Sequence, residues 1–131
     1  MDSAGVSGTG LLCARNRTRG TILCASLEEA GGVVGKSRGL LGRNGLEADA
    51  GMLFEAGRLE PFMWMHMMFM RFAIDIVFLD DDGKVARINH NLKPWRISSM
   101  VWGARKALEL AAGAAVRSQT MEGDQIILER R

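Results

Sequence analysis

The clearest pattern of apolar and polar positions lies at residues 74–92. The run 74–79 is rich in β-branched and aromatic side chains, 80–84 is polar and contains Gly83, and 85–92 alternates again. Two such runs about a short glycine-containing turn are typical of a β-hairpin. We expect Gly83 to take the positive φ that the turn requires.

Shorter patterns predict the other elements. The apolar runs 11–14 and 21–25 flank a polar stretch and predict a second hairpin. The segment 62–70 is apolar at both parities except for His66, which predicts a strand buried on both faces. Further predictions are strands at 107–110 and 125–128, one or two helical turns within 111–119, and a tight turn at Gly123–Asp124.

A helix is predicted to begin at Ser26. Ser26 and Glu29 match the capping box, in which the two residues satisfy each other's backbone amides. Short strands outnumber helices in this reading. The predicted fold class is therefore α+β, with a small, strongly bent or partly closed mixed β-sheet, barrel-like, and short helices.

Composition places the chain among ordinary globular domains. It has 131 residues, 47% of them hydrophobic and 24% charged, with a net charge of +2. This excludes a disordered or fibrous protein and gives no reason to expect a nucleic-acid partner. We expect a poorly ordered tail at 1–10 and a single domain at 11–131, a monomer or weak dimer.

The sequence also bears on location and cofactors. Charged residues interrupt every long apolar stretch and residues 1–10 have no signal-peptide pattern, so we expect a cytoplasmic protein without a membrane span. Cys13 and Cys24 are the only cysteines and are not spaced as a metal or dithiol motif. Buried thiols are expected, and no cofactor is.

Six blocks of the chain follow one another in a recognisable order: Arg38-Gly39-Leu40-Leu41-Gly42-Arg43, Gly51-Met52-Leu53-Phe54, His66 with Phe69 through Asp80, Lys93-Pro94-Trp95-Arg96, Ala107 through Gly113, and Gly123-Asp124. In register, between about residues 21 and 128, they resemble the bacterial and archaeal domain of unknown function 192 family, in its subset with a His-x-x-Phe-Met-Arg-Phe-x-Ile-Asp block. The resemblance implies a small α+β fold with a partly closed sheet and no established activity. Alanines at 73 and 111 stand where the family pattern has proline, and Met67 stands where it has a hydroxyl residue.

Asp75 is the first candidate for a functional role. Its side chain shares a strand face with apolar residues and needs a partner, for which His66, Arg71 and backbone amides are the candidates. A structural carboxylate is favoured over a catalytic one.

The leading functional hypothesis is a non-catalytic module that binds a small anionic molecule or a peptide in a cleft. Arg71 would orient an acidic group and Trp95 would supply apolar contact. No catalytic residue is assigned. The candidate ligand-binding residues are His66, Arg71, Asp75, Trp95, Trp64 and Arg43.

Two alternatives remain open. Five methionines between Met63 and Met70, together with His66, offer soft ligands that suit Cu(I). A hydrolase-type enzyme using His66 and Asp75 is the other alternative.

Overall fold

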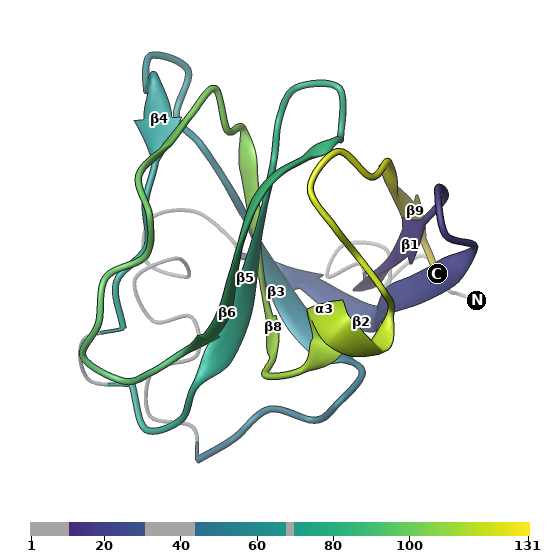
Figure 1. The fold of residues 1–131 in the computed structure, drawn as a ribbon, viewed down its shortest axis with the longest axis horizontal. Helices are drawn as coiled ribbons and strands as arrows, with labels where there is room; N and C mark the ends of the chain where they lie inside the picture. The colour runs from purple at the N-terminus through teal and green to yellow at the C-terminus, as the bar shows by residue number, and fades with distance from the viewer. Residues whose placement is uncertain (1–10, 31–43, 68–69) are drawn as a thin grey trace.

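The computed structural model describes residues 11–30, 44–67 and 70–131, which form mainly β-strands (Figure 1). The elements are β1 (Leu11–Asn16), β2 (Thr21–Glu29), β3 (Ala50–Glu55), β4 (Phe62–Met63), β5 (Ile74–Leu79), β6 (Val85–Leu92), β7 (Val101–Trp102), β8 (Lys106–Ala111), α3 (Ala114–Arg117) and β9 (Ile126–Arg130).

Both predicted hairpins are confirmed. Strands β1 and β2 pair antiparallel, as do β5 and β6. Gly83 has a φ of 81° in the β5–β6 turn, where its backbone accepts the bond from Ile126 N at 2.9 Å. The predicted strands at β8 and β9, the helical turn at α3 and the turn at Gly123 are also present.

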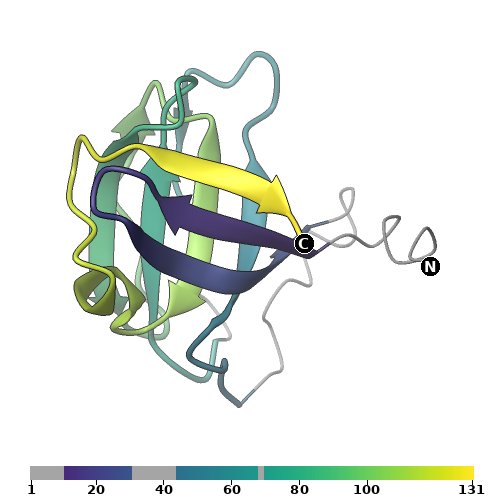
Figure 2. The same ribbon diagram turned by 90° about the vertical axis from the view of Figure 1, so that its right-hand side faces the viewer.

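Seven strands form one curled sheet in the order β6-β5-β8-β3-β2-β1-β9. Strands β2 and β3 are parallel, whereas the other neighbours are antiparallel. Figure 2 shows β1, β2 and β9 crossing in front of β5, β6 and β8. The two edges of the sheet meet through a bridge between Lys84 and Gln125, beside a 2.9 Å bond from Val85 N to Asp124 O. The prediction of a bent, partly closed mixed sheet is therefore confirmed.

The predicted helical content is corrected. In the described ranges, α3 is the one helix and it has four residues. No helix in this part of the chain is long and apolar enough to cross a membrane.

The two faces of the sheet each carry a core, because side chains alternate along every strand. On β5, Val77 and Leu79 point to the inner core, and Ile76 and Phe78 point to the outer core. The inner core comprises Leu12, Ala14, Leu23, Cys24, Leu27, Leu53, Val77, Leu79, Val85, Leu108, Leu110, Ala114 and Ile126. The outer core comprises Met52, Phe54, Met63, Met67, Met70, Ile74, Ile76, Phe78, Val101, Ala104 and Ala107.

Gly51 shows how closely the strands pack. A Cβ at this position would lie 2.7 Å from Leu110 Cδ2 and 2.8 Å from Glu109 O. Any larger residue there would push β3 away from β8.

The predicted helix at Ser26 is wrong. Residues 21–29 form β2, and Ser26 N donates to Asp49 O at 2.8 Å. The parallel pairing of Ser26 with Ala50 thus satisfies the amide that the capping box would have used. Long-range strand pairing outweighs a local capping pattern worth about 1 kcal/mol. Residues 1–10 and 31–43, including the predicted tail, lie outside the described residues.

The predicted long strand at 62–70 is also corrected. Among its described residues, 62–67 and 70, the strand is Phe62–Met63, and one side of the segment is exposed, with Trp64 46% accessible. The run is apolar at both parities, which predicted burial of both faces. Trp64 and His66 instead face solvent, because no second layer of protein packs on their side in the described part of the chain.

Candidate functional site

Residues 62–67 and 95–102 run antiparallel as a strand pair on the outer side of the sheet. Strands β4 and β7 pair through Phe62 with Trp102 and Met63 with Val101. A bridge between His66 and Ile97 continues the pairing. In Figure 1 the segment that bears β4 lies at the left, apart from β1, β2 and β9 at the right.

Backbone bonds hold the far end of this pair. Met67 N donates to Arg96 O and Trp95 N donates to Met67 O, both at 2.7 Å. Ser98 N donates to Met65 O at 2.8 Å, and the Ser98 hydroxyl accepts from Met65 N at 2.8 Å. The two segments are therefore fixed to each other along their length.

The inner side of the strand pair is buried in the outer core. Met63 and Val101 are each 6% exposed, and Met67 is fully buried. Burial of each such side chain contributes about 1.5–3 kcal/mol, which anchors the pair on the sheet.

The opposite side of the pair is apolar, aromatic and open to solvent. Directly paired residues share a face, so Phe62 lies beside Trp102, with ring centroids 4.9 Å apart. The rings of Trp64 and His66 are 6.3 Å apart. Trp102 is 69% exposed and Ile97 61%. We call this surface the aromatic face; it comprises Phe62, Trp64, His66, Ile97, Met100 and Trp102.

Basic residues flank the aromatic face in the sequence. The segments 57–72 and 93–105 contain five arginines and lysines against one acid, Glu60. The Arg105 guanidinium donates hydrogen bonds to Gly57 O at 2.9 Å and Glu60 O at 2.8 Å, and so holds the loop before β4. The exposed members are Arg58, Arg71, Lys93 and Arg96.

The sequence-predicted residues fall in different places. Trp64 and His66 lie together on the aromatic face, and Trp95, 59% exposed with a φ of 68°, lies beside its end. Arg71 is exposed and donates to Asn44 Oδ1 at 3.1 Å. Arg43 lies outside the described residues.

Asp75 lies on the other face of the sheet. It alternates with Ile74 and Ile76 of the outer core, so its side chain shares the inner face with Val77. It is 1% exposed. Backbone amides, one of the three kinds of partner considered, bind its oxygens: Asn91 N at 2.8 Å, Gly113 N at 3.1 Å and Ala115 N at 3.0 Å. Asp75 therefore holds α3 and the end of β6 against β5.

This placement bears on the two alternatives. Both Asp75 oxygens already accept backbone bonds, and the carboxylate faces away from the aromatic face that carries His66. Met63, Met67 and Met70 pack in the outer core, where flexible thioethers fill space between rigid side chains. The arrangement lends no support to the hydrolase pair, and the buried methionines have a packing role.

Glu109 is a buried carboxyl group that the sequence did not single out as a site. It pairs across the sheet with Met52 and Ile76, so its side chain points to the outer core. Glu109 is 6% exposed, and burial raises its pKa from 4.5 to about 7. Alternation along β8 could have placed Glu109 on the face opposite Leu108 and Leu110. Only the strand order shows that the outer core covers that face.

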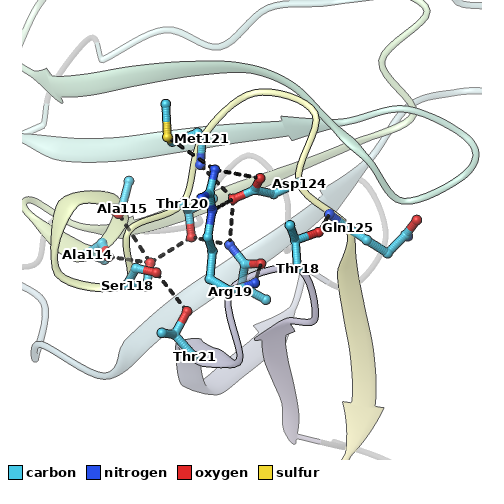
Figure 3. Close-up of polar contacts among 11 residues, drawn as sticks. Thr18, Arg19, Thr21, Ala114, Ala115, Ser118, Thr120, Met121, Asp124 and Gln125 are labelled. Carbon is cyan, nitrogen blue, oxygen red and sulfur yellow. Dashed lines mark hydrogen bonds and ion pairs between the residues drawn. The ribbon is translucent and has the colours of Figure 1, made fainter.

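A cluster of polar side chains around the buried Asp124 joins the β1–β2 turn to the turn that precedes β9 (Figure 3). Asp124 Oδ2 accepts from Arg19 Nε at 2.9 Å, from Asn16 Nδ2 at 3.0 Å and from Met121 N at 3.0 Å. Asn16 also donates to Thr120 Oγ1 at 3.0 Å. These residues close the sheet rather than form a site, and the sequence predicted the turn at Asp124 without its partners.

A curled sheet with a solvent-exposed strand pair on its outer face defines a small barrel-like β-domain. Residues 14–128 match the family DUF192, described as "Uncharacterized ACR, COG1430". The chain belongs to this family. No curated protein matches the chain.

Two solved structures share the fold. A protein of unknown function from Novosphingobium aromaticivorans DSM 12444 is 22% identical with a TM-score of 0.74, over 89% of this chain and 83% of that one. A putative transcription regulator from Sinorhizobium meliloti 1021 is 24% identical with a TM-score of 0.76, over 91% and 92%. At these identities the similarity extends to the fold alone.

Proposed function

We propose that this protein is a non-catalytic binding module that takes an extended, acidic peptide segment of a partner protein on its aromatic face. The observation that carries the proposal is the two-sidedness of the strand pair. Met63, Met67 and Val101 bury one side, and the other exposes large apolar side chains that a lone domain has no folding reason to expose.

An extended peptide fits the shape of this surface. Within the described residues, β4 and β7 form a two-stranded sheet and pair only with each other. An exposed strand edge accepts a further strand through backbone hydrogen bonds, while side chains on the face supply apolar contacts.

Charge favours an acidic peptide over a basic one. Arg58, Lys93 and Arg96 are exposed within the segments that form or adjoin the face, and the same segments contain a single acid. Complementary charge at the rim of an apolar patch speeds association and selects the partner.

Tryptophan is expected to provide most of the affinity. Exposed tryptophans that become buried on binding are typical hot spots, and truncating one costs about 2 kcal/mol or more, a factor of about 30 in Kd. Trp64 and Trp102 are the candidates, since both lie on the aromatic face.

The test is selection from a random twelve-residue peptide library displayed on phage, using the full chain as bait. Peptides that also bind the Trp64→Ala, Trp102→Ala double variant are removed in each round. We expect the survivors to be enriched in acidic and apolar residues. Their synthetic forms should bind at least about 30-fold more weakly to either single variant, measured by fluorescence polarisation.

The matched control is Val116→Ala, which truncates an apolar side chain that is 69% exposed on α3, away from the face. It should leave the Kd unchanged. The proposal would be contradicted if no selected peptide bound the unmodified chain without also binding the double variant. Enrichment of basic peptides would contradict it too.

A further inference from the structure

A separate pocket of about 420 Å³ lies between β2, α3 and the turn that precedes β3. Its lining includes Thr21, Leu23 and Ala25 of β2, Arg117 and Ser118 at the end of α3, and Asp49. The volume falls within the range of roughly 300–1,000 Å³ that is typical of small-molecule sites. The pocket does not involve the aromatic face.

Two opposite charges line this pocket without neutralising each other. Arg117 donates from Nη2 to Ala48 O at 2.9 Å. Asp49 uses its backbone carbonyl to accept from Ser26 N and Cys24 Sγ, at 2.8 and 3.4 Å. Among the ion pairs of the described residues there is none between these two side chains.

The two charges line the same pocket and still have capacity to bind a ligand. One guanidinium has five N–H donors, of which Arg117 uses one on Ala48, and the Asp49 carboxylate has no hydrogen bond within the described part of the chain. Both residues are exposed to solvent.

The rest of the pocket is apolar or already satisfied. Ile22, which is 51% exposed, and the half-buried Ala25 present hydrocarbon. The hydroxyls of Thr21 and Ser118 donate to Ser118 O at 2.7 Å and Ala114 O at 2.9 Å, as part of the contacts in Figure 3. A ligand here finds one cation, one anion and an apolar wall.

We propose that the pocket binds a small zwitterion of the free α-amino acid class. The ligand carboxylate lies on the Arg117 guanidinium, its ammonium group on the Asp49 carboxylate, and its side chain against Ile22 and Ala25. Charge-assisted hydrogen bonds at both ends explain why a ligand with both charges is preferred to one with either alone.

The test is titration of the ¹⁵N-labelled full chain with L-leucine, L-glutamate and L-lysine to about 20 mM, followed by amide chemical shifts. We expect saturable shifts at Thr21, Leu23 and Asp49. N-acetyl-L-leucine lacks the ammonium group and L-leucinamide lacks the carboxylate, so each should bind at least about tenfold more weakly than L-leucine.

The variants assign each charge. Asp49→Asn should weaken L-leucine about tenfold and leave N-acetyl-L-leucine unchanged, whereas Arg117→Gln should weaken L-leucine and leave L-leucinamide unchanged. Both residues are exposed, and the melting temperature checks that each variant is folded. Asp81→Asn and Arg87→Gln, exposed elsewhere, are the matched controls.

The proposal is overturned if none of the three amino acids gives saturable shifts in the pocket. It is also overturned if the blocked forms bind as well as L-leucine, or if Asp49→Asn and Arg117→Gln bind it as tightly as the unmodified chain does. Because peptide selection on the aromatic face uses a different surface, the two proposals succeed or fail separately.

Discussion

The Oδ2 atom of Asp75 accepts the backbone N–H of Ala115 at 3.0 Å, and so joins β5 to α3 across 40 residues of sequence. With Gly113 N on the same oxygen and Asn91 N on Oδ1, the carboxylate receives three amides while 1% exposed. In a short helix with no side-chain cap of its own, this supplies what a local N-cap would supply.

We therefore expect Asp75→Asn to lower the free energy of unfolding by about 2–4 kcal/mol, because an amide group turned toward backbone N–H groups leaves donors unsatisfied. Urea denaturation measures the change. Asp81→Asn, on an exposed turn, is the control and should stay within about 0.5 kcal/mol. A similar small effect at Asp75 would mean that its hydrogen bonds do not hold α3.

Glu109 should make the protein less stable as the pH rises. Burial raises its pKa in the folded chain from 4.5 to about 7, so between these values the folded state binds more protons than the unfolded state. Its contribution is fully present below pH 4.5 and is lost as the pH rises through 7.

The measurement is urea unfolding at pH 5 and pH 8 for the unmodified chain and for Glu109→Gln. The unmodified chain should lose about 2–3 kcal/mol more than the variant over this interval. Glu122→Gln removes an exposed carboxylate and serves as the control. If the unmodified chain and Glu109→Gln showed the same pH dependence, folding would not raise the pKa of Glu109, and the prediction would be wrong.

Cys24 should be chemically inert in the folded protein. Burial, the largest cause, raises its pKa to about 11, and the charges of Cys13 and Asp49 act in the same direction. At pH 8 the thiolate of Cys24 is therefore scarce, and iodoacetamide should modify it at least about a hundredfold more slowly than in urea.

Peptide mapping by mass spectrometry distinguishes the two free cysteines. Cys13 is half-buried and lies between Leu12 and Ala14, whose side chains point to the inner core, so it faces the other side of the sheet. It should react first. Modification of Cys24 at the rate seen in urea would contradict its burial in the inner core.

Arg19 and Asp124 should be energetically coupled. Burial alone would raise the pKa of Asp124, but hydrogen bonds from Arg19, Asn16 and Met121 outweigh it and lower the pKa below 3.8. The stability that this group provides is present above its usual pKa and is lost as the pH falls through the lowered value.

We expect Asp124→Ala to cost about 2–4 kcal/mol and Arg19→Gln less, with the double variant less destabilised than the sum by about 1 kcal/mol or more. Urea unfolding of the four proteins completes the cycle. Arg15→Gln with Glu129→Gln, an exposed pair at 3.3 Å, is the control and should show coupling below about 1 kcal/mol. Additive effects at Arg19 and Asp124 would show that the two residues act independently.

Local patterns predicted elements whose stabilising contacts are close in sequence. The β5–β6 hairpin and the glycine turn at Gly83 follow from alternation and from the φ that only glycine adopts readily. The capping box at Ser26 failed because Asp49 O, distant in sequence, takes the same amide. The predicted strand at 62–70 failed for the converse reason, since Trp64 is 46% exposed and is not buried by a second layer of protein.

The sequence by itself determined that this chain forms short strands in a bent sheet, because side-chain alternation and glycine turns are local consequences of backbone geometry. It also determined family membership, through ordered blocks that the match over residues 14–128 confirms. Only the tertiary structure decided which face of the sheet each polar residue occupies. Strand order and register separate Asp75 from Trp64 and His66, and they bring Arg117 to the same pocket as Asp49, because contacts between distant segments depend on pairings that no local pattern specifies.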